Sequence, residues 1–349
     1  MRHLAWFLTL ACCGCAGPVP APRPAKQKPA PVAEAPAALR PASARERAIA
    51  AELRADVAEL AGKIGERNAD KKWELASAAD WLVEALEKAG YAVQRDGHEI
   101  DGVAVQNLAA EVRGGRAAKE VVIVGAHYDS AQGSPGANDN ASGVAGVLAL
   151  ARRYKGAAID RSLRFVLFAN EEPPHFQTPK MGSWLYAQGV QARGEKVVAM
   201  LSLESIGVYS DAAGSQRAPK ALEGKVPTVG NFTAVVGNTE SKALVDLVAE
   251  GLSVRGSLPA IGAALPREVP EAGWSDHWSF WKIGVPAVMI TDTAPFRDPH
   301  YHRPTDTPAR LDYDRAARLV VGLESVIAEL VGESTALAPD KKSKDLLVP

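Results

Sequence analysis

Cysteine is almost absent from this chain. Its 349 residues include three cysteines, Cys12, Cys13 and Cys15, and none follows residue 15. No disulfide can therefore cross-link the main part of the chain, and catalysis or metal binding by a thiolate is excluded there. The fold must rest on apolar burial, which a chain of this length can supply.

A large net charge and a long apolar run are also missing. The formal net charge is −1 and no long basic stretch occurs, so the composition gives no support for nucleic-acid binding. The apolar run at residues 4–13 is too short to span a bilayer. Because it follows the basic start Met1-Arg2-His3 and ends in small residues, it is typical of a secretory signal.

The cysteines fall at the end of this signal. The sequence Leu10-Ala11-Cys12-Cys13-Gly14-Cys15 resembles the bacterial lipoprotein signal, in which a cysteine after small residues is lipidated and becomes the mature N-terminus. Cys15 is the first choice and Cys12 the second; an ordinary cleaved signal with incidental cysteines is the alternative. We expect an exported protein, either a periplasmic or outer-membrane lipoprotein that meets the membrane only through its N-terminal lipid, or a secreted protein.

Composition divides the rest of the chain into three parts. Residues 16–43 consist mainly of Ala and Pro with scattered Lys and Arg, which predicts a semi-extended tether. Residues 44–335 are predicted to form one domain, and residues 336–349 a disordered tail. Within the domain, the Gly- and Pro-containing segment 210–274 is expected to form a lobe that shapes a pocket.

Helical and strand patterns alternate within the domain. Helical spacing of apolar residues predicts helices at residues 45–61, 73–89, 141–154, 181–188, 241–252 and 313–331. Alternation predicts an antiparallel strand pair at 91–95 and 105–112, and continuous apolar runs predict buried strands at 121–125, 163–169, 197–203, 232–236 and 286–290. Such a pattern is typical of a single three-layer α/β domain, with a mixed, mostly parallel sheet and helices on both faces.

Two adjacent acids, Glu171 and Glu172, follow the apolar strand at 163–169. Neighbouring carboxylates next to a buried strand are costly, because each disfavours ionisation of the other. The pair becomes favourable when a cation lies between the two or when one of them carries a proton. In dinuclear hydrolases one carboxylate binds a metal ion and its neighbour takes a proton from the attacking water. The alternative is a pair of solvated loop acids.

Other candidate residues follow strands or lie in turns. His127 and Asp129 are two positions apart, so that on an extended segment they share a side. This suits a metal-binding His whose other ring nitrogen is held by Asp129, and it equally suits a hydrogen-bonded structural His. Asp139 lies in a Gly-rich turn, where it could bind a metal ion or cap the following helix. Glu204 is a lone acid after a strand.

The last part of the chain adds a further His and two acids. His302 lies in a polar loop, and Asp306, four positions on, could orient it as a ligand. Ser275-Asp276-His277 does not fit a hydrolytic triad, because the Ser and the His are almost adjacent and no GxSxG motif occurs. We interpret Asp276 as a carboxylate that contacts the metal ligands and not the metal ion itself. We interpret His277 as a residue that packs in the core or lines the pocket.

Together these motifs resemble those of the zinc-dependent exopeptidase family that includes bacterial leucyl aminopeptidases. The resemblance runs from about Arg45 to Val331. The motifs that occur in the family's order are His127-Tyr-Asp129-Ser, Gly136-Ala-Asn-Asp139-Asn-Ala-Ser-Gly143, Asn170-Glu171-Glu172-Pro-Pro174, Met181-Gly-Ser183, Leu203-Glu204-Ser-Ile-Gly207, Ser275-Asp-His277, and Tyr301-His302 with Asp306-Thr307. A single match of this kind would be expected by chance. The whole series in the family's order is not, so the resemblance is highly specific.

The resemblance implies a mixed sheet between helices, with two zinc ions per chain at its carboxyl edge. It implies one bridging ligand and two further ligands for each ion, namely Asp139 as the bridge, His127 and Glu204 for the first ion, and Glu172 and His302 for the second. Glu171 is then the general base, while Asp129 and Asp276 lie behind the ligands. A cis peptide bond after Asp139 is also implied.

The implied activity is that of a metallopeptidase. We expect an aminopeptidase that hydrolyses N-terminal residues of peptides through zinc-activated water, with carboxypeptidase and dipeptidase activity as alternatives. The chain departs from the family at two places. Glu204 stands where many relatives carry Asp. Gly273 and Trp274 stand where some relatives carry a Tyr that donates to the oxyanion, which leaves that donor unassigned.

Two other functions fit less of the sequence. A glutaminyl cyclase, an aminoacyltransferase of the same general fold, uses one zinc ion and tends to have Trp before the last ligand His, where this chain has Tyr301. A non-catalytic receptor-like domain of this fold usually lacks a ligand or the base, and none is missing here. The sequence predicts neither the preferred substrate side chain nor the oligomeric state.

Overall fold

The computed structural model describes residues 39–332. The predicted signal at 1–15, most of the predicted tether and the predicted tail at 336–349 lie outside this range. The first helix, α1 (Ala44–Val57), begins at a reciprocal cap, in which the Glu46 N–H donates to Ser43 Oγ (3.1 Å) and the Ser43 N–H donates to Glu46 Oε2 (2.7 Å). Among residues 39–332, no helix is both long and apolar enough to cross a membrane.

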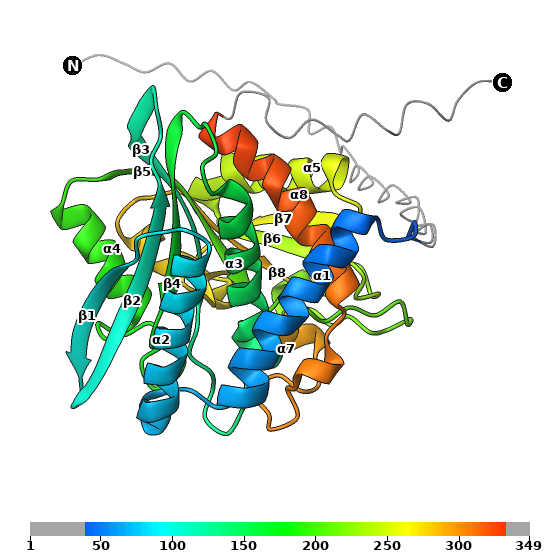
Figure 1. Ribbon diagram of the computed structural model, residues 1–349. Coiled ribbons are helices and arrows are strands. Elements are labelled where there is room, and N and C mark those ends of the chain that lie inside the picture. Colours follow the sequence, from blue (N-terminus) through cyan, green and yellow to red (C-terminus); the bar gives the residue numbers. More distant parts are fainter. Residues whose placement is uncertain (1–38, 333–349) are drawn as a thin grey trace, which may run out of the picture. The chain divides into compact units, whose positions relative to one another are not determined.

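Eight strands of the described residues form one sheet, in the order β1-β2-β4-β3-β5-β8-β6-β7 (Figure 1). They are β1 (Gln94–Ile100), β2 (Val103–Val112), β3 (Ala117–His127), β4 (Arg161–Phe168), β5 (Lys196–Glu204), β6 (Thr233–Asn238), β7 (Ala260–Leu265) and β8 (Ala287–Thr291). The pairs β4–β3, β3–β5, β5–β8 and β6–β7 are parallel, whereas β1–β2, β2–β4 and β8–β6 are antiparallel. The sheet is therefore mixed, with a parallel centre, as predicted.

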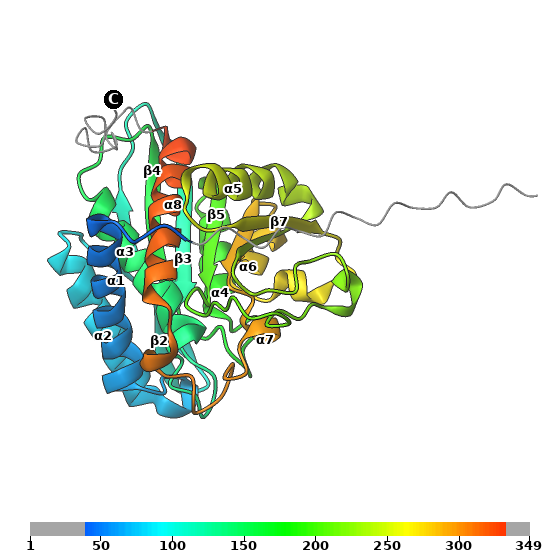
Figure 2. The same cartoon turned by 90° about the vertical axis from the view of Figure 1, so that its right-hand side faces the viewer.

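Helices cover both faces of this sheet (Figures 1 and 2). On one face lie α1, α2 (Lys72–Lys88), α3 (Gly143–Tyr154), α5 (Lys242–Arg255) and α8 (Tyr313–Val331). On the other lie α4 (Gly182–Ala192) and α6 (His277–Lys282). Successive residues of β3 point to opposite faces of the sheet. Val122 and Val124 pack in the core under the first set of helices, and Val121 and Ile123 pack in the core under α4 and α6. The predicted three-layer α/β fold is confirmed.

Four elements differ from the predictions. The strand predicted at 91–95 begins only at Gln94, because Tyr91 turns into the core, where it is 5% exposed and its hydroxyl donates to the Ala151 carbonyl oxygen (2.8 Å). The sequence does not predict β7, which consists mostly of small residues without alternation. It also misses α6 and the four-residue α7 (Ala294–Arg297), which are too short to show a helical period.

The parallel centre brings three strand ends to one edge of the sheet. β4, β3 and β5 are adjacent and parallel. β3 ends at His127 and β5 ends at Glu204, while β4 ends at Phe168, shortly before Glu171. Open α/β sheets bind ligands at their carboxyl edge, so this topology gathers the candidate residues in one place.

Candidate metal centre

Asp139 reaches this edge on the turn before α3. The Asp139–Asn140 peptide bond is cis, as the resemblance implies. Gly136 in the same turn has a φ of +61°, and a Cβ atom there would lie 2.4 Å from the Asp139 carbonyl oxygen, so the turn requires glycine. Asn140, and not Asp139, caps α3, because its Oδ1 accepts the Gly143 N–H (3.1 Å). The Asp139 side chain is thus left for another role.

Asp306 holds this turn from another part of the chain. Its Oδ1 accepts the Asn138 N–H (2.8 Å) and its Oδ2 accepts the Asp139 N–H (3.1 Å). Within residues 39–332 it makes no hydrogen bond to the His302 ring. The interpretation of Asp306 as the residue that orients His302 is therefore wrong: its carboxylate positions the backbone that carries Asp139.

Two groups of possible metal ligands share Asp139. Asp139 Oδ1 lies 3.3 Å from His127 Nε2, and Asp139 Oδ2 lies 3.0 Å from His302 Nε2. Glu204 Oε2 lies 3.2 Å from His127 Nε2, and Glu172 Oε2 lies 3.3 Å from His302 Nε2. Within each group the ligand atoms all lie within 4.8 Å of one another. The structure thus brings together the residues that the resemblance implies as ligands.

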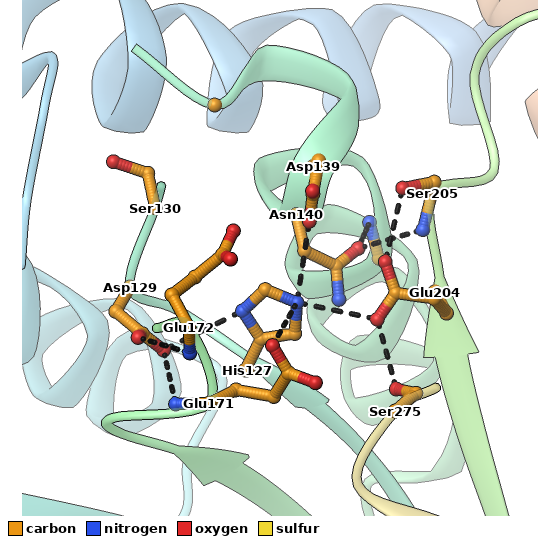
Figure 3. A network of polar contacts seen from close by, with 12 residues as sticks. His127, Asp129, Ser130, Asp139, Asn140, Glu171, Glu172, Glu204, Ser205 and Ser275 are labelled. Carbon is orange, nitrogen blue, oxygen red and sulfur yellow. Dashed lines mark hydrogen bonds and ion pairs between the residues drawn. The ribbon is translucent and has the colours of Figure 1, made fainter. Parts of the chain in front are cut away.

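Glu171 lies beside these groups without belonging to either (Figure 3). It is buried, and its Oε2 lies 3.8 Å from His127 Nε2. Asp129 fixes the acidic pair from behind, because its Oδ1 accepts the Glu171 N–H (3.1 Å) and its Oδ2 accepts the Glu172 N–H (3.0 Å). Asp129 Oδ1 also lies 3.4 Å from His127 Nδ1. One buried carboxylate therefore positions the backbone of both acids and lies beside the imidazole.

The protonation of the acids follows from their burial. Burial raises the pKa of Glu171 well above its usual value, and neighbouring carboxylates add to this against the charge of His127. Burial and the charge of Asp139 raise the pKa of Glu172 to about 7. For Asp139, burial acts in the same direction, but contacts with His127 and His302 outweigh it and lower the pKa. Asp139 is therefore the most readily ionised of the three.

The two imidazoles respond in the opposite sense. Burial alone would lower the pKa of His302, but contacts with Asp139 and Glu172 raise it to about 10. The pKa of His127 is also raised, because the charges of surrounding acids, Glu171 first, outweigh its burial. Without a metal ion, the rings therefore supply only part of the positive charge that the acids require.

These residues fit divalent cations. Four buried carboxylates meet only two imidazoles, so the cluster lacks positive charge even when both rings are protonated; the acids are Asp139, Glu171, Glu172 and Glu204. Glu172 Oε1 and His302 Nε2 are buried atoms with no hydrogen-bond partner in the described part of the chain. Imidazole and carboxylate ligands without sulfur suit zinc in an open catalytic site.

Asp276 and His277 are fully buried near the ligands. Burial raises the pKa of Asp276 to about 7, against the charge of His127. His277 Nε2 lies 2.7 Å from the Ala272 carbonyl oxygen, and its ring packs edge-on against Trp281 with centroids 4.5 Å apart. Burial lowers the pKa of His277 to about 4. His277 is thus a neutral packing residue.

Three residues that contact the candidate ligands stand in the motifs of the sequence but were given no role there. Ser205 Oγ donates to Glu204 Oε1 (3.0 Å), and Ser275 Oγ donates to Glu204 Oε2 (2.8 Å). The Tyr301 ring stacks on His302 with centroids 3.8 Å apart. Ser205 and Tyr301 each adjoin a ligand in sequence, which was the available signal, whereas nothing local connects Ser275 to Glu204.

The backbone is strained beside three of the acidic and imidazole groups. Asn170 before Glu171, Ser205 after Glu204, and His302 itself have φ values of 54°, 50° and 57°. Non-glycine residues rarely adopt this left-handed conformation, and such residues cluster at functional sites. The chain therefore turns sharply at the points where it presents these groups.

A largely apolar cavity of about 350 Å³ adjoins the centre. Its lining includes the acids of both ligand groups and also Glu171. The apolar lining comes largely from the segment 210–274 and β8, and includes Leu222, Val226, Phe232, Ile261, Leu265 and Met289. Trp274 and Phe296 also line it, with nearly parallel rings 6.3 Å apart. The cavity therefore joins a charged end to an apolar wall.

Comparisons with known proteins agree with this geometry. The sequence profile described as peptidase family M28 matches residues 107–324. Uncharacterized protein YfbL of Escherichia coli (strain K12) is 36% identical over 273 residues, which cover 76% of this chain and 83% of YfbL. Aminopeptidase YwaD of Bacillus subtilis (strain 168) is 27% identical over 200 residues, which cover 56% of this chain and 38% of YwaD.

Solved structures share the fold at lower identity. BSAP, a zinc aminopeptidase from Bacillus subtilis, matches with a TM-score of 0.62 at 15% identity, over 81% of this chain and 95% of BSAP. A glutaminyl cyclase from Fimbriiglobus ruber matches with a TM-score of 0.57 at 21% identity, over 80% of this chain and 94% of that one. The profile match over more than half of the sequence, together with the identity to YfbL, shows that the chain belongs to peptidase family M28.

Proposed function

We propose that the protein is a zinc-dependent aminopeptidase that binds two zinc ions per chain. One observation supports the pair of ions most directly: the two oxygens of Asp139 face different imidazoles, those of His127 and His302. Glu204 would complete the first site and Glu172 the second. The family membership and the aminopeptidase relatives support the activity.

Glu171 is the proposed general base. Zinc held by the two ligand groups would polarise the scissile carbonyl and lower the pKa of the attacking water. Glu171 lines the cavity, belongs to neither ligand group and is held at its backbone by Asp129. It accepts the proton of the attacking water and passes it to the leaving amine.

Tyr301 is the proposed donor to the oxyanion, which the sequence left unassigned. It lines the cavity beside His302, whereas Trp274, which stands near the position of the Tyr in some relatives, has no hydroxyl. Burial and the charges of the surrounding acids raise the pKa of Tyr301 well above its usual value. The phenol therefore keeps its proton at neutral pH and can donate a hydrogen bond to developing negative charge.

The cavity supports a preference for peptides with a large apolar N-terminal residue. Burying a Leu or Phe side chain in such a lining contributes about 1.5–3 kcal/mol. The acids at the charged end attract the protonated N-terminal amine, which a blocked peptide lacks. These two features select the free end of a peptide and its first side chain.

Peptides with a free N-terminus and Leu, Met or Phe first are expected to be cleaved after that residue. Replacing the first residue by Asp should lower kcat/KM roughly 10- to 100-fold, by the lost apolar burial. Acetylated peptides should resist cleavage, C-terminal amides should not, and a chelator should stop all hydrolysis. Chromatography of the products measures each rate. Equal cleavage of acetylated peptides, or release of C-terminal residues, would contradict an aminopeptidase.

A glutaminyl cyclase is the second candidate, because the Fimbriiglobus ruber enzyme shares the fold. The presence of two ligand groups favours the peptidase, since a cyclase that binds one zinc ion requires only one of them. Zinc counted per chain separates the two, with two ions favouring the peptidase and one favouring the cyclase. Cyclisation of an N-terminal glutaminyl peptide supplies an independent assay.

We also propose that the protein is exported and lipidated at Cys15 or, failing that, at Cys12. The support is the short apolar run and the small residues around these cysteines, which lie outside the described residues. In bacterial cells the full-length chain should sediment with membranes, and the double substitution Cys12→Ala with Cys15→Ala should release it. Cys13→Ala is the matched control and should stay with the membranes. Membrane retention of the double variant would contradict lipidation.

A further inference from the structure

Arg67 is a fully buried arginine beneath the metal centre. It lies between α1 and α2 and has no exposed surface. A buried guanidinium is costly unless its N–H groups are satisfied, so its partners indicate what the position is for.

The Arg67 side chain ties together three separate stretches of backbone. Its Nε donates to the Tyr128 carbonyl oxygen (2.6 Å), and its Nη1 donates to those of Gly65 (3.0 Å) and Pro135 (2.6 Å). Its Nη2 donates to the Gly136 carbonyl oxygen (3.0 Å). Each of these four hydrogen bonds ends on a backbone carbonyl oxygen, and none on a carboxylate.

These partners lie next to the ligands in sequence. Tyr128 stands between His127 and Asp129, and Gly136 begins the turn that carries Asp139. The planar guanidinium spans both, so it fixes the separation of the segment after β3 and the Asp139 turn. Both segments contribute ligands to the same candidate site.

Neighbours of Arg67 strengthen the same junction. The Ser130 N–H donates to the Arg67 carbonyl oxygen (2.9 Å), and the Arg67 N–H donates to Ser130 Oγ (3.1 Å). Asn68 Nδ2 donates to the Ser130 carbonyl oxygen (3.1 Å), and Glu66 Oε1 accepts the Gly133 N–H (2.8 Å). The segment 65–68 is thus docked along the loop between the two ligand-bearing segments.

The charge of Arg67 also suits this place. Burial lowers its pKa to about 10, opposed by the charges of Asp129, Asp306, Asp139 and Glu172, so it remains protonated at neutral pH. A fixed cation behind an excess of carboxylates reduces their mutual repulsion without competing for their ligand oxygens.

We propose that Arg67 is a positioning residue of the metal centre, which holds the His127–Asp129 segment and the Asp139 turn at the separation that zinc binding requires. The proposal rests on the proposed function, because it concerns the same metal site. Lysine cannot replace Arg67, since one ammonium group cannot reach carbonyl oxygens on both sides as the guanidinium fork does.

The test uses the full chain loaded with zinc. Arg67→Lys keeps the charge and loses the fork, and Arg67→Met loses both. Mutating a residue that orients metal ligands typically lowers metal affinity 10- to 100-fold. We expect roughly this loss of zinc affinity for Arg67→Lys, and competition with a chelator measures it. The cobalt-substituted protein should show a changed visible spectrum, because ligand geometry changes. If Arg67→Met does not fold, Arg67→Lys carries the test.

Arg318→Lys is the matched control. Arg318 is a buried arginine of α8 whose side chain donates to the Arg40 carbonyl oxygen (2.5 Å) and Ser257 Oγ (3.2 Å), away from the ligands. The Arg318→Lys substitution should lower the melting temperature and leave zinc affinity and the cobalt spectrum unchanged. If Arg67→Lys does the same, Arg67 only stabilises the fold and the proposal is overturned. If the unaltered chain binds no zinc, the proposed function itself fails, and this proposal with it.

Discussion

Replacing Glu171 by alanine is expected to abolish hydrolysis of aminoacyl p-nitroanilides while zinc stays bound. General base catalysis typically contributes roughly 100- to 10,000-fold, so kcat should fall by about that factor. The substitution removes a carboxylate that belongs to neither ligand group, so the ligands keep their positions. Absorbance assays give the rate, and elemental analysis of the same sample gives the zinc content.

The position of Glu171 explains why its substitution should lower the rate without removing zinc. Its side chain lies 3.8 Å from His127 Nε2, farther than the carboxylates of Asp139 and Glu204, which lie 3.3 and 3.2 Å from it. Its backbone is fixed by Asp129 independently of its side chain. Glu172, its neighbour in sequence, points instead to His302. The geometry thus suits one acid of the pair to bind a metal ion and leaves the other free to carry a proton.

The pH dependence checks the same role. A base acts only when unprotonated, so the activity of the unaltered enzyme should fall as the pH drops through the pKa of Glu171. Burial and neighbouring carboxylates raise that pKa, and bound cations lower it. Glu87→Ala, at an exposed position on α2, is the matched control and should keep both the rate and its acidic limb. Full activity of Glu171→Ala would remove Glu171 as the base.

The positions of the candidate ligands could be predicted because local pattern and topology agree on them, whereas their roles as ligands came from the family resemblance. His127 and Glu204 each end a buried strand, and parallel neighbouring strands place such ends together. The helix at 313–331 was predictable for a similar reason, since its long apolar period matches α8. Features that repeat along the chain, or that follow a strand, leave a readable signal.

Contacts between distant parts of the chain leave no such signal. Asp306 stands near His302 in sequence, which suggested that it orients the ring, yet it binds the backbone at Asn138 and Asp139, 168 and 167 residues away. Arg67 reaches Tyr128 and Gly136 across 61 and 69 residues. A side chain that satisfies remote backbone carbonyls looks like any other polar residue until the fold places its partners.

Asp139→Asn is expected to cost the protein both zinc ions, and hydrolysis should fall to background. The asparagine side chain keeps the shape of Asp139 but has no charge and only one oxygen, so it would turn an amide N–H group toward one cation. Because the two Asp139 oxygens face His127 and His302 separately, neither site keeps its full set of ligands. Zinc per chain, measured after gel filtration in zinc-free buffer, should fall from two to none.

Substitutions of ligands that belong to only one of the two groups test whether Asp139 binds both zinc ions or only one. Glu204→Gln should weaken only the first site and His302→Ala only the second, leaving about one ion per chain in each case, because each belongs to one ligand group. Asp246→Asn, an exposed acid on α5, is the matched control and should keep both ions. If Asp139→Asn keeps one ion, Asp139 serves a single site and the shared-carboxylate arrangement is wrong. If Asp139→Asn loses both ions while each of the other variants keeps at least one, the two sites share Asp139.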